Sequence, residues 1–178
     1  MIISYQGAES FKISQGDLTL AVNPVSKINA DISLFTNKRA SPAEAGAKAG
    51  FIIDGPGEYE IKDVFVKGFL IKEGEIYQTT YLITFEGIKL CFLGAVQAVK
   101  DIEDVDILFV PVGADAAAAY KFAVSLEPSV IIPMLSDAKS LAQFVKEGGE
   151  KVEAIDKFVV KKKDLEGKEG EIVVLKEE

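Results

Sequence analysis

In the first half of the chain, hydrophobic residues occur in short runs that end at turn-forming residues. Runs of strand length cover residues 1–5, 10–14, 17–22, 30–36, 51–54, 64–71, 76–85 and 89–93. Gln15-Gly16, Asn23-Pro24 and the Gly-Pro-Gly of residues 55–57 separate several of them, and such sequences favour turns. Short apolar runs between turns are typical of β-strands. We therefore predict consecutive, largely antiparallel strands here, with one short helix over residues 43–48 that Ser41 caps.

The second half alternates strand and helix patterns. Residues 106–111 and 130–133 are apolar runs typical of buried strands, and an aspartate follows each of them. Asp115 is predicted to cap a helix through Leu126, and Asp137 a helix through Glu147 that ends at Gly148-Gly149. Residues 158–163 and 171–176 predict two terminal strands. The alternation implies crossovers that place helices on a sheet, so the pattern favours a layered α/β (α+β) sandwich with mixed sheets. We find no linker and predict one domain over residues 1–178.

Composition limits the function. The net charge is −8, which disfavours nucleic acid and anionic membrane surfaces as partners. The sequence contains no histidine, so catalysis by a serine–histidine or cysteine–histidine pair is excluded. The single cysteine cannot form an intramolecular disulfide, and no apolar run has the length of a membrane span. We therefore expect a cytoplasmic protein that does not enter a membrane.

Eight segments, in order along the chain, are similar to the metallo-β-lactamase superfamily. They are SYQGAESFKI, LTLAVNP, ADISLFT, GPGEYEIKDVFVKG, EGIKLCFLG, DILFVPVG, LEPSVIIPM and FVVKKKDLEG. The resemblance covers nearly the whole chain and is greatest to the small cytoplasmic branch that is similar to ascorbate-6-phosphate lactonase. It implies a four-layer αββα sandwich with mixed sheets.

The same resemblance places other residues where the superfamily carries its metal ligands. A His-x-His-x-Asp-His loop would fall on Asn37, Arg39, Ser41 and Pro42. A His-Leu-Gly-Asp segment is matched by residues 92–95, which puts Phe92 and Ala95 at ligand positions, and Leu135 stands at the last histidine. The family's Asp-Pro dipeptide is here Asn23-Pro24. Zinc requires three or more N, O or S ligands, so we expect a degenerate member with no zinc or other cofactor, and not an enzyme.

Two functions remain open from these residues. The first is a non-catalytic binding, regulatory or subunit-assembly module. The alternative is a hydrolase of a phosphorylated lactone or phosphodiester that uses a non-standard site, either carboxylate-bound Mg²⁺ or the loop of Asn37, Arg39 and Ser41. Arg39 is the only arginine, and with Asn37 and Ser41 it could bind a small anionic ligand. A homo-oligomer or a protein partner is also compatible with the sequence.

Other chemistry-bearing residues have plainer explanations. Glu58 and Glu60, with Asp54 nearby, could form a carboxylate pair, but a turn-stabilising role for Glu58 and packing of Tyr59 on the sheet are favoured. Cys91 lies in an apolar strand and is expected to be a small buried hydrophobe. The lysines at 161–163 are expected to form a solvated edge.

Overall fold

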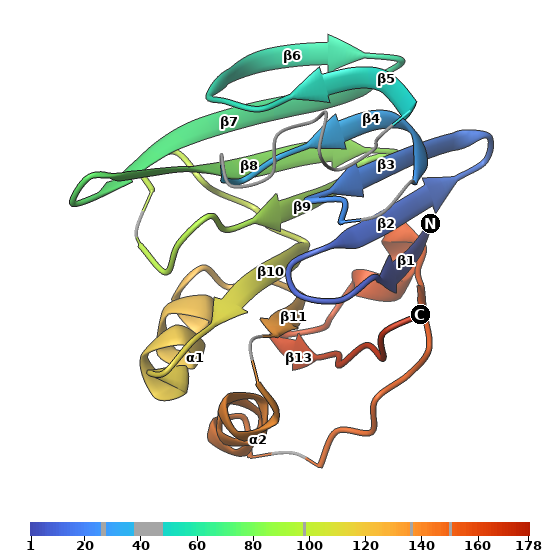
Figure 1. The fold of residues 1–178 in the computed structure, drawn as a ribbon. Helices are drawn as coiled ribbons and strands as arrows, with labels where there is room; N and C mark the ends of the chain where they lie inside the picture. Colours follow the sequence, from blue (N-terminus) through green and yellow to red (C-terminus); the bar gives the residue numbers. More distant parts are fainter. Residues whose placement is uncertain (26–27, 38–47, 98, 136, 150) are drawn as a thin grey trace.

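The computed structural model describes residues 1–25, 28–37, 48–97, 99–135, 137–149 and 151–178, and their strands form two sheets that face each other (Figure 1). The first sheet has the order β12-β1-β2-β3-β4-β5 and the second has the order β13-β11-β10-β9-β8-β7-β6. The strands of the first sheet are β1 (Ile2–Tyr5), β2 (Phe11–Gln15), β3 (Leu18–Val22), β4 (Asn29–Leu34), β5 (Lys48–Ile53) and β12 (Phe158–Val159). Those of the second are β6 (Gly57–Ile61), β7 (Val64–Glu73), β8 (Ile76–Phe85), β9 (Ile88–Phe92), β10 (Ile107–Val112), β11 (Val130–Leu135) and β13 (Glu171–Ile172).

Both sheets are mixed. In the first sheet, β1, β2 and β3 pair antiparallel, whereas β3, β4 and β5 pair parallel. In the second sheet, β6 to β9 pair antiparallel, and β9, β10, β11 and β13 pair parallel. Parallel strands bring their carboxyl ends to the same edge of a sheet, and this edge is where α/β proteins commonly bind ligands.

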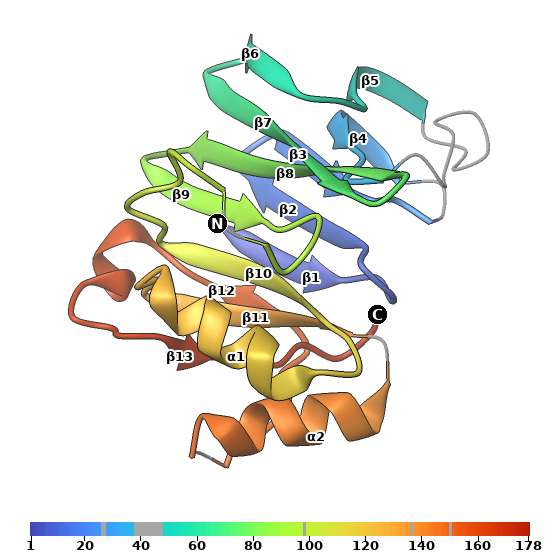
Figure 2. The same cartoon turned by 90° about the vertical axis from the view of Figure 1, so that its left-hand side faces the viewer.

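Helices α1 (Ala116–Ser125) and α2 (Ala138–Glu147) lie on the outer face of the second sheet, against β10 and β11 (Figure 2). Each begins at the predicted aspartate: Asp115 accepts a hydrogen bond from the backbone N–H of Ala118 at 2.9 Å, and Asp137 from that of Ser140 at 2.8 Å. Such caps satisfy N–H groups that a helix leaves unpaired. Small residues of α1, among them Ala119 and Ala123, are buried and let it approach the sheet closely.

Side chains of the central strands alternate between the two faces of the second sheet. Ile107 and Phe109 point into the core between the sheets, whereas Leu108 and Val110 pack beneath the helices. The intersheet core also holds Phe11 from the first sheet. The prediction of an α+β sandwich with mixed sheets is therefore confirmed. None of the helices formed by the described residues has the length and apolar character that crossing a membrane requires.

The structure differs from the sequence-based prediction in three places. The predicted helix over 43–48 lies mostly outside the described residues, and its last residue, Lys48, instead begins strand β5. Strand β6 was not expected, because the Gly-Pro-Gly turn obscures its start. The two terminal strands are shorter than the predicted 158–163 and 171–176: β12 joins β1 in the first sheet through two residues, and β13 joins β11 in the second through two residues. A short 3-10 helix, η1 (Lys162–Leu165), lies between them.

Candidate functional site

A pocket of about 1400 Å³ opens where the segments that follow β3 and β4 meet the start of α2. The β1–β2 loop, the start of β8 and the segment after β13 complete its described wall. A second pocket of about 430 Å³ adjoins it, because Asn37 and Tyr77 line both. A concave site at the carboxyl ends of parallel strands is the default position for a ligand, so we take these pockets, together called the strand-end site, as the candidate functional site.

Asn23 holds the first wall of the strand-end site together. Its backbone has a φ of +48°, a conformation that asparagine adopts more readily than most residues. The side-chain Nδ2 donates to Thr36 Oγ1 at 2.9 Å and to the Glu9 carbonyl at 3.4 Å, while Oδ1 accepts from the Thr36 N–H at 2.8 Å. An aspartate could not donate to the Glu9 carbonyl when ionised. The amide at this position therefore joins β3, the end of β4 and the β1–β2 loop.

Asn37 is the one residue of the expected anion-binding group that the structure describes. Arg39, Ser41 and Pro42 lie outside the described residues, so that group stays a prediction. Asn37 forms an isolated antiparallel bridge with Gln78 of β8. Its Nδ2 lies 3.5 Å from the carboxylate Oε2 of Glu9. The described neighbour of Asn37 in the site is thus an acidic group.

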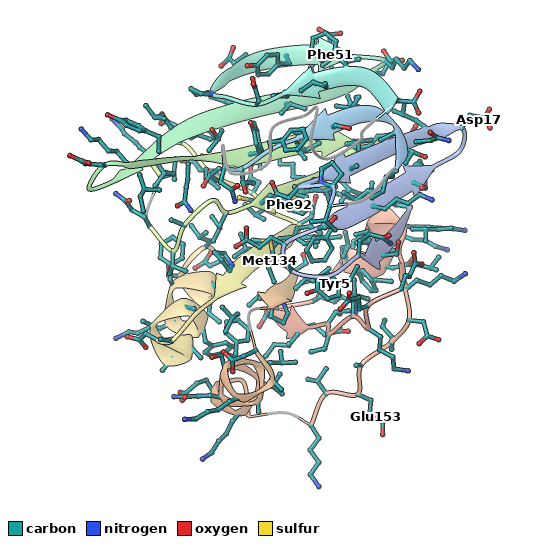
Figure 3. All side chains as sticks on the ribbon, viewed as in Figure 1. Tyr5, Asp17, Phe51, Phe92, Met134 and Glu153 are labelled. Carbon is teal, nitrogen blue, oxygen red and sulfur yellow. The ribbon has the colours of Figure 1, made fainter. Side chains whose placement is uncertain are left out.

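Phe92 occupies a position where the resemblance implies a histidine ligand, and it is fully buried between the sheets (Figure 3). Its ring stacks on Phe109, with centroids 3.8 Å apart and 10° between the planes. Phe11 meets both rings edge-on. Beyond Phe92, the backbone N–H of Gly94 donates to the buried Thr80 hydroxyl at 3.0 Å. The segment is therefore anchored by apolar packing and one buried hydrogen bond to β8.

The zinc pair that the fold family implies does not fit these side chains. The chain has no histidine, and no three Cys, Asp or Glu side chains among the described residues gather closely enough to hold a metal ion. Of the other ligand positions, Ala95 offers no donor atom in its side chain, and Leu135 ends β11 with an apolar side chain. Zinc needs several N, O or S donors held at about 2.0–2.3 Å. We derive no chemical step through zinc.

Two carboxylates converge on Tyr5 at the same site. Burial, followed by the negative charges of Glu177 and Glu9, raises the pKa of Tyr5. Tyr5 and Glu177 form a parallel bridge, and the Glu177 carboxylate lies over Gly7, where an added Cβ would be 2.6 Å from Oε1. The Tyr5 hydroxyl itself donates to the Ala8 carbonyl at 2.9 Å. The strand-end site therefore carries concentrated negative charge beside a neutral phenol.

Gln78 supplies a side-chain oxygen that has no hydrogen-bond partner among the described residues. Its Oε1 is buried and makes no hydrogen bond there, although buried polar atoms are normally paired. Sequence reasoning missed Gln78 as well as Tyr5, Glu9 and Glu177. No sequence signal connects them, since they lie on separate elements that only the sheet pairing brings together. Because this oxygen is buried, a bound molecule could reach it only after the Gln78 side chain turns toward the pocket.

The remaining sequence candidates do not gather into a second site. Glu58 and Glu60 are exposed on β6, and Glu58 pairs with Lys67 at 3.3 Å, so the suggested bond from Glu58 to the turn is wrong. Tyr59 packs against the core as predicted. Cys91 is buried as expected, and burial raises the pKa of its thiol to about 12.

These features define the class of protein. Two mixed sheets, helices on β10 and β11, and a pocket at the carboxyl ends of the parallel strands are the arrangement of a metallo-β-lactamase sandwich. The sequence profile of the family described as "Beta-lactamase superfamily domain" matches residues 2–135. The chain therefore belongs to the β-lactamase superfamily. None of the curated proteins compared with the chain matches it.

Solved structures agree with this assignment. A Thermotoga maritima protein, named as a candidate Zn-dependent hydrolase of the metallo-β-lactamase superfamily, is 26% identical, with a TM-score of 0.83 and 99% of each chain covered. A metallo-hydrolase of Ignicoccus hospitalis is 16% identical, with a TM-score of 0.59 over 90% of this chain and 99% of that one. An isothiocyanate hydrolase from Delia radicum gut bacteria is 11% identical, with a TM-score of 0.60 over 84% and 93%. The last two are similar in fold alone.

One expectation from the sequence is overturned by these comparisons. Loss of every histidine ligand led us to expect that the chain is not an enzyme, but the family match and the Thermotoga maritima neighbour, which is named as a candidate Zn-dependent hydrolase, point to an enzyme family. Nothing in the comparisons supports a non-catalytic role. The physical reason for the error is that missing imidazoles exclude one way of activating water and leave carboxylate-based ways untouched.

Proposed function

We propose that this chain is a hydrolase that cleaves an ester-type bond of a small substrate in the strand-end site without a histidine-held zinc pair. The observation that carries the proposal is the convergence of Glu9 and Glu177 on one pocket beside the unpaired Gln78 oxygen. The family assignment and the hydrolase name of the Thermotoga maritima protein support the reaction class.

The proposed chemistry needs a base and a group that orients the substrate. A carboxylate within reach of a water can accept its proton as the water attacks a carbonyl or phosphoryl centre, and it can return that proton to the departing alcohol oxygen as the ester bond breaks. Glu9 is the better placed base, since it is half-buried and lies beside Asn37, whereas Glu177 is exposed. Gln78 Oε1 would accept a hydrogen bond from a substrate N–H or O–H once its side chain turns toward the pocket. Amide N–H groups of Asn37 or Gln78 would donate to the oxygen that gains negative charge.

The test is a panel of lactones, aryl esters and phosphodiesters incubated with protein purified in chelator. We expect turnover of at least one ester class without added metal, and a loss of about 100-fold in kcat for Glu9→Gln. Glu60→Gln, an exposed carboxylate on β6, is the matched control and should retain full activity. Turnover that requires zinc, or that survives Glu9→Gln unchanged, would contradict the proposal.

The phosphorylated lactone and the phosphodiester, which the sequence left open as alternative substrates, need a separate test. They rely on Arg39 and Ser41, whereas four carboxylates line the described wall of the larger pocket. Including phosphodiesters and a phosphorylated lactone in the panel decides between the substrates. Preference for them over uncharged esters would place the anion-binding loop in the site.

A further inference from the structure

The mouth of the strand-end site is bordered by large apolar side chains that are exposed. Val25 of the β3–β4 connection is 61% exposed, and Ile76 and Tyr77 at the start of β8 are 52% and 50% exposed. All three line the larger pocket, and Leu70 of the neighbouring strand, 55% exposed, lines the smaller one with Tyr77. Exposed apolar side chains that gather around a pocket commonly mark a ligand site. We call Val25, Leu70, Ile76 and Tyr77 the apolar rim.

The wall behind the apolar rim is acidic. Its described charged residues are four carboxylates, those of Glu9, Glu75, Asp137 and Glu177, and one ammonium, that of Lys176. The Lys176 Nζ lies 3.0 Å from Asp156 Oδ1, so its charge is already shared with a carboxylate. Negative charges gathered in one cleft repel an anion and attract a cation, and low-dielectric walls strengthen both effects.

We infer that the strand-end site selects a cationic amphiphile, with its apolar group against the apolar rim and its ammonium facing Glu9 and Glu177. The inference rests on the proposed function only where it names an ester as the substrate. The preference for a cation over an anion follows from the walls of the pocket alone. A substrate of this kind would be an ester that carries an apolar chain and an amine.

Binding of simple amphiphiles tests the inference without any turnover. Octyltrimethylammonium, octyl sulfate and octyl glucoside share one chain and differ in charge, and tetramethylammonium has the charge without the chain. Calorimetry measures the affinities at concentrations at which the amphiphiles form no micelles. Octyltrimethylammonium should bind about tenfold more tightly than octyl sulfate. Tetramethylammonium should bind more weakly than octyltrimethylammonium, because it buries no chain.

Variants separate the two contributions. Tyr77→Ser should lower the affinity for octyltrimethylammonium and for octyl glucoside alike, by about fivefold. Glu177→Gln should lower only the affinity for octyltrimethylammonium, also by about fivefold. Phe65→Ser is the matched apolar control, since Phe65 is 50% exposed on β7 and lines neither pocket. Glu60→Gln is the matched charge control. Both controls should leave the affinities for the three octyl compounds unchanged.

The outcomes distinguish this inference from the proposed function. Selective binding of the cation with no ester turnover would support the inference and count against hydrolysis. Turnover by a protein that binds octyl sulfate as tightly as octyltrimethylammonium would support hydrolysis and overturn the inference. Unchanged binding in Tyr77→Ser would also overturn it, because the apolar rim would then hold no ligand.

Discussion

The rings of Phe92 and Phe109 lie parallel in the core, 3.8 Å between centroids, with Phe92 at a position that the family gives to a histidine. We predict that Phe92→His lowers the free energy of unfolding by about 3 kcal/mol, because stacking is lost and a polar ring is buried. Urea denaturation with and without zinc measures the effect. Phe65→His, at an exposed site, should change little. Full stability without zinc would contradict the role of the stacked rings, and rescue by zinc would show that a metal site persists here.

Tyr81 ties the two sheets together beside the smaller pocket. Its buried hydroxyl lies 3.0 Å from the Phe35 carbonyl and 3.3 Å from that of Gly55, both of which are residues of the smaller pocket. Tyr81→Phe should therefore cost about 1–2 kcal/mol of unfolding free energy, since buried carbonyls lose their donor. Denaturant titration checks this, with the half-exposed Tyr77→Phe as control. Equal stability of Tyr81→Phe and the parent would contradict a cross-linking role.

Asn23→Asp restores the family's carboxylate and should still destabilise the protein. The new oxygen would face the Glu9 carbonyl, to which Asn23 Nδ2 now donates. We expect a loss of about 1–2 kcal/mol at neutral pH and a smaller loss at acidic pH, where a protonated carboxyl can donate again. Chemical denaturation at both pH values measures the difference. A loss that does not depend on pH would indicate that the Glu9 contact contributes nothing.

Stability should decline in alkali. Burial raises the pKa of Cys91 from 9.0 to about 12, and burial with Glu177 and Glu9 raises that of Tyr5 above 10.0. The folded state thus holds these protons more tightly than the unfolded state, so stability is full below pH 9 and falls as pH rises toward 12. Between its unfolded-state pKa and its folded-state pKa, each group lowers the free energy of unfolding by about 1.4 kcal/mol per pH unit. Cys91→Ala should reduce the slope between pH 9 and 10, and an unchanged slope would contradict burial of the thiol.

Arg39 provides the test of the predicted anion site. If Arg39, Asn37 and Ser41 bind an anion, Arg39→Ala should weaken binding of inorganic phosphate or of a sugar phosphate by about tenfold. Calorimetry measures this, and Lys121→Ala, on helix α1, is a control of the same charge. Phosphate affinity that does not change in Arg39→Ala would remove the loop from the site and favour the cationic ligand.

Local signals predicted much of the fold. Asp115 and Asp137 marked both helix starts, because a capping aspartate acts within three residues of its own position. The strand at 76–85 was predicted with its observed bounds, since alternating apolar residues and the flanking glycines are local. Strand β6 was missed because its pairing with β7 is what makes residues 57–61 extended, and pairing is not encoded in a short window.

The candidate site was less predictable. Asn37, which the resemblance placed at a ligand position, lines the larger pocket, whereas its expected role in anion binding stays a prediction. Glu9, Gln78 and Glu177 were not singled out, since each lies on a different element and is unremarkable among its sequence neighbours. The functional prediction failed for a related reason. The residues at the family's ligand positions indicate that histidine cannot hold zinc here. The carboxylates that line the pocket are brought together only by the folded sheets, so the sequence did not indicate them.

The pairing of β1 with β12 also affects the order in which the protein folds. Ile2 lies opposite Val159, and Tyr5 bridges to Glu177, so β1 has its outer partners in residues that lie far along the chain from it. Contacts between distant parts of a chain form slowly, since a long loop must close first. During folding, β1 therefore keeps an open edge until β12 pairs with it, and the acidic wall of the pocket is completed only when Glu177 reaches Tyr5.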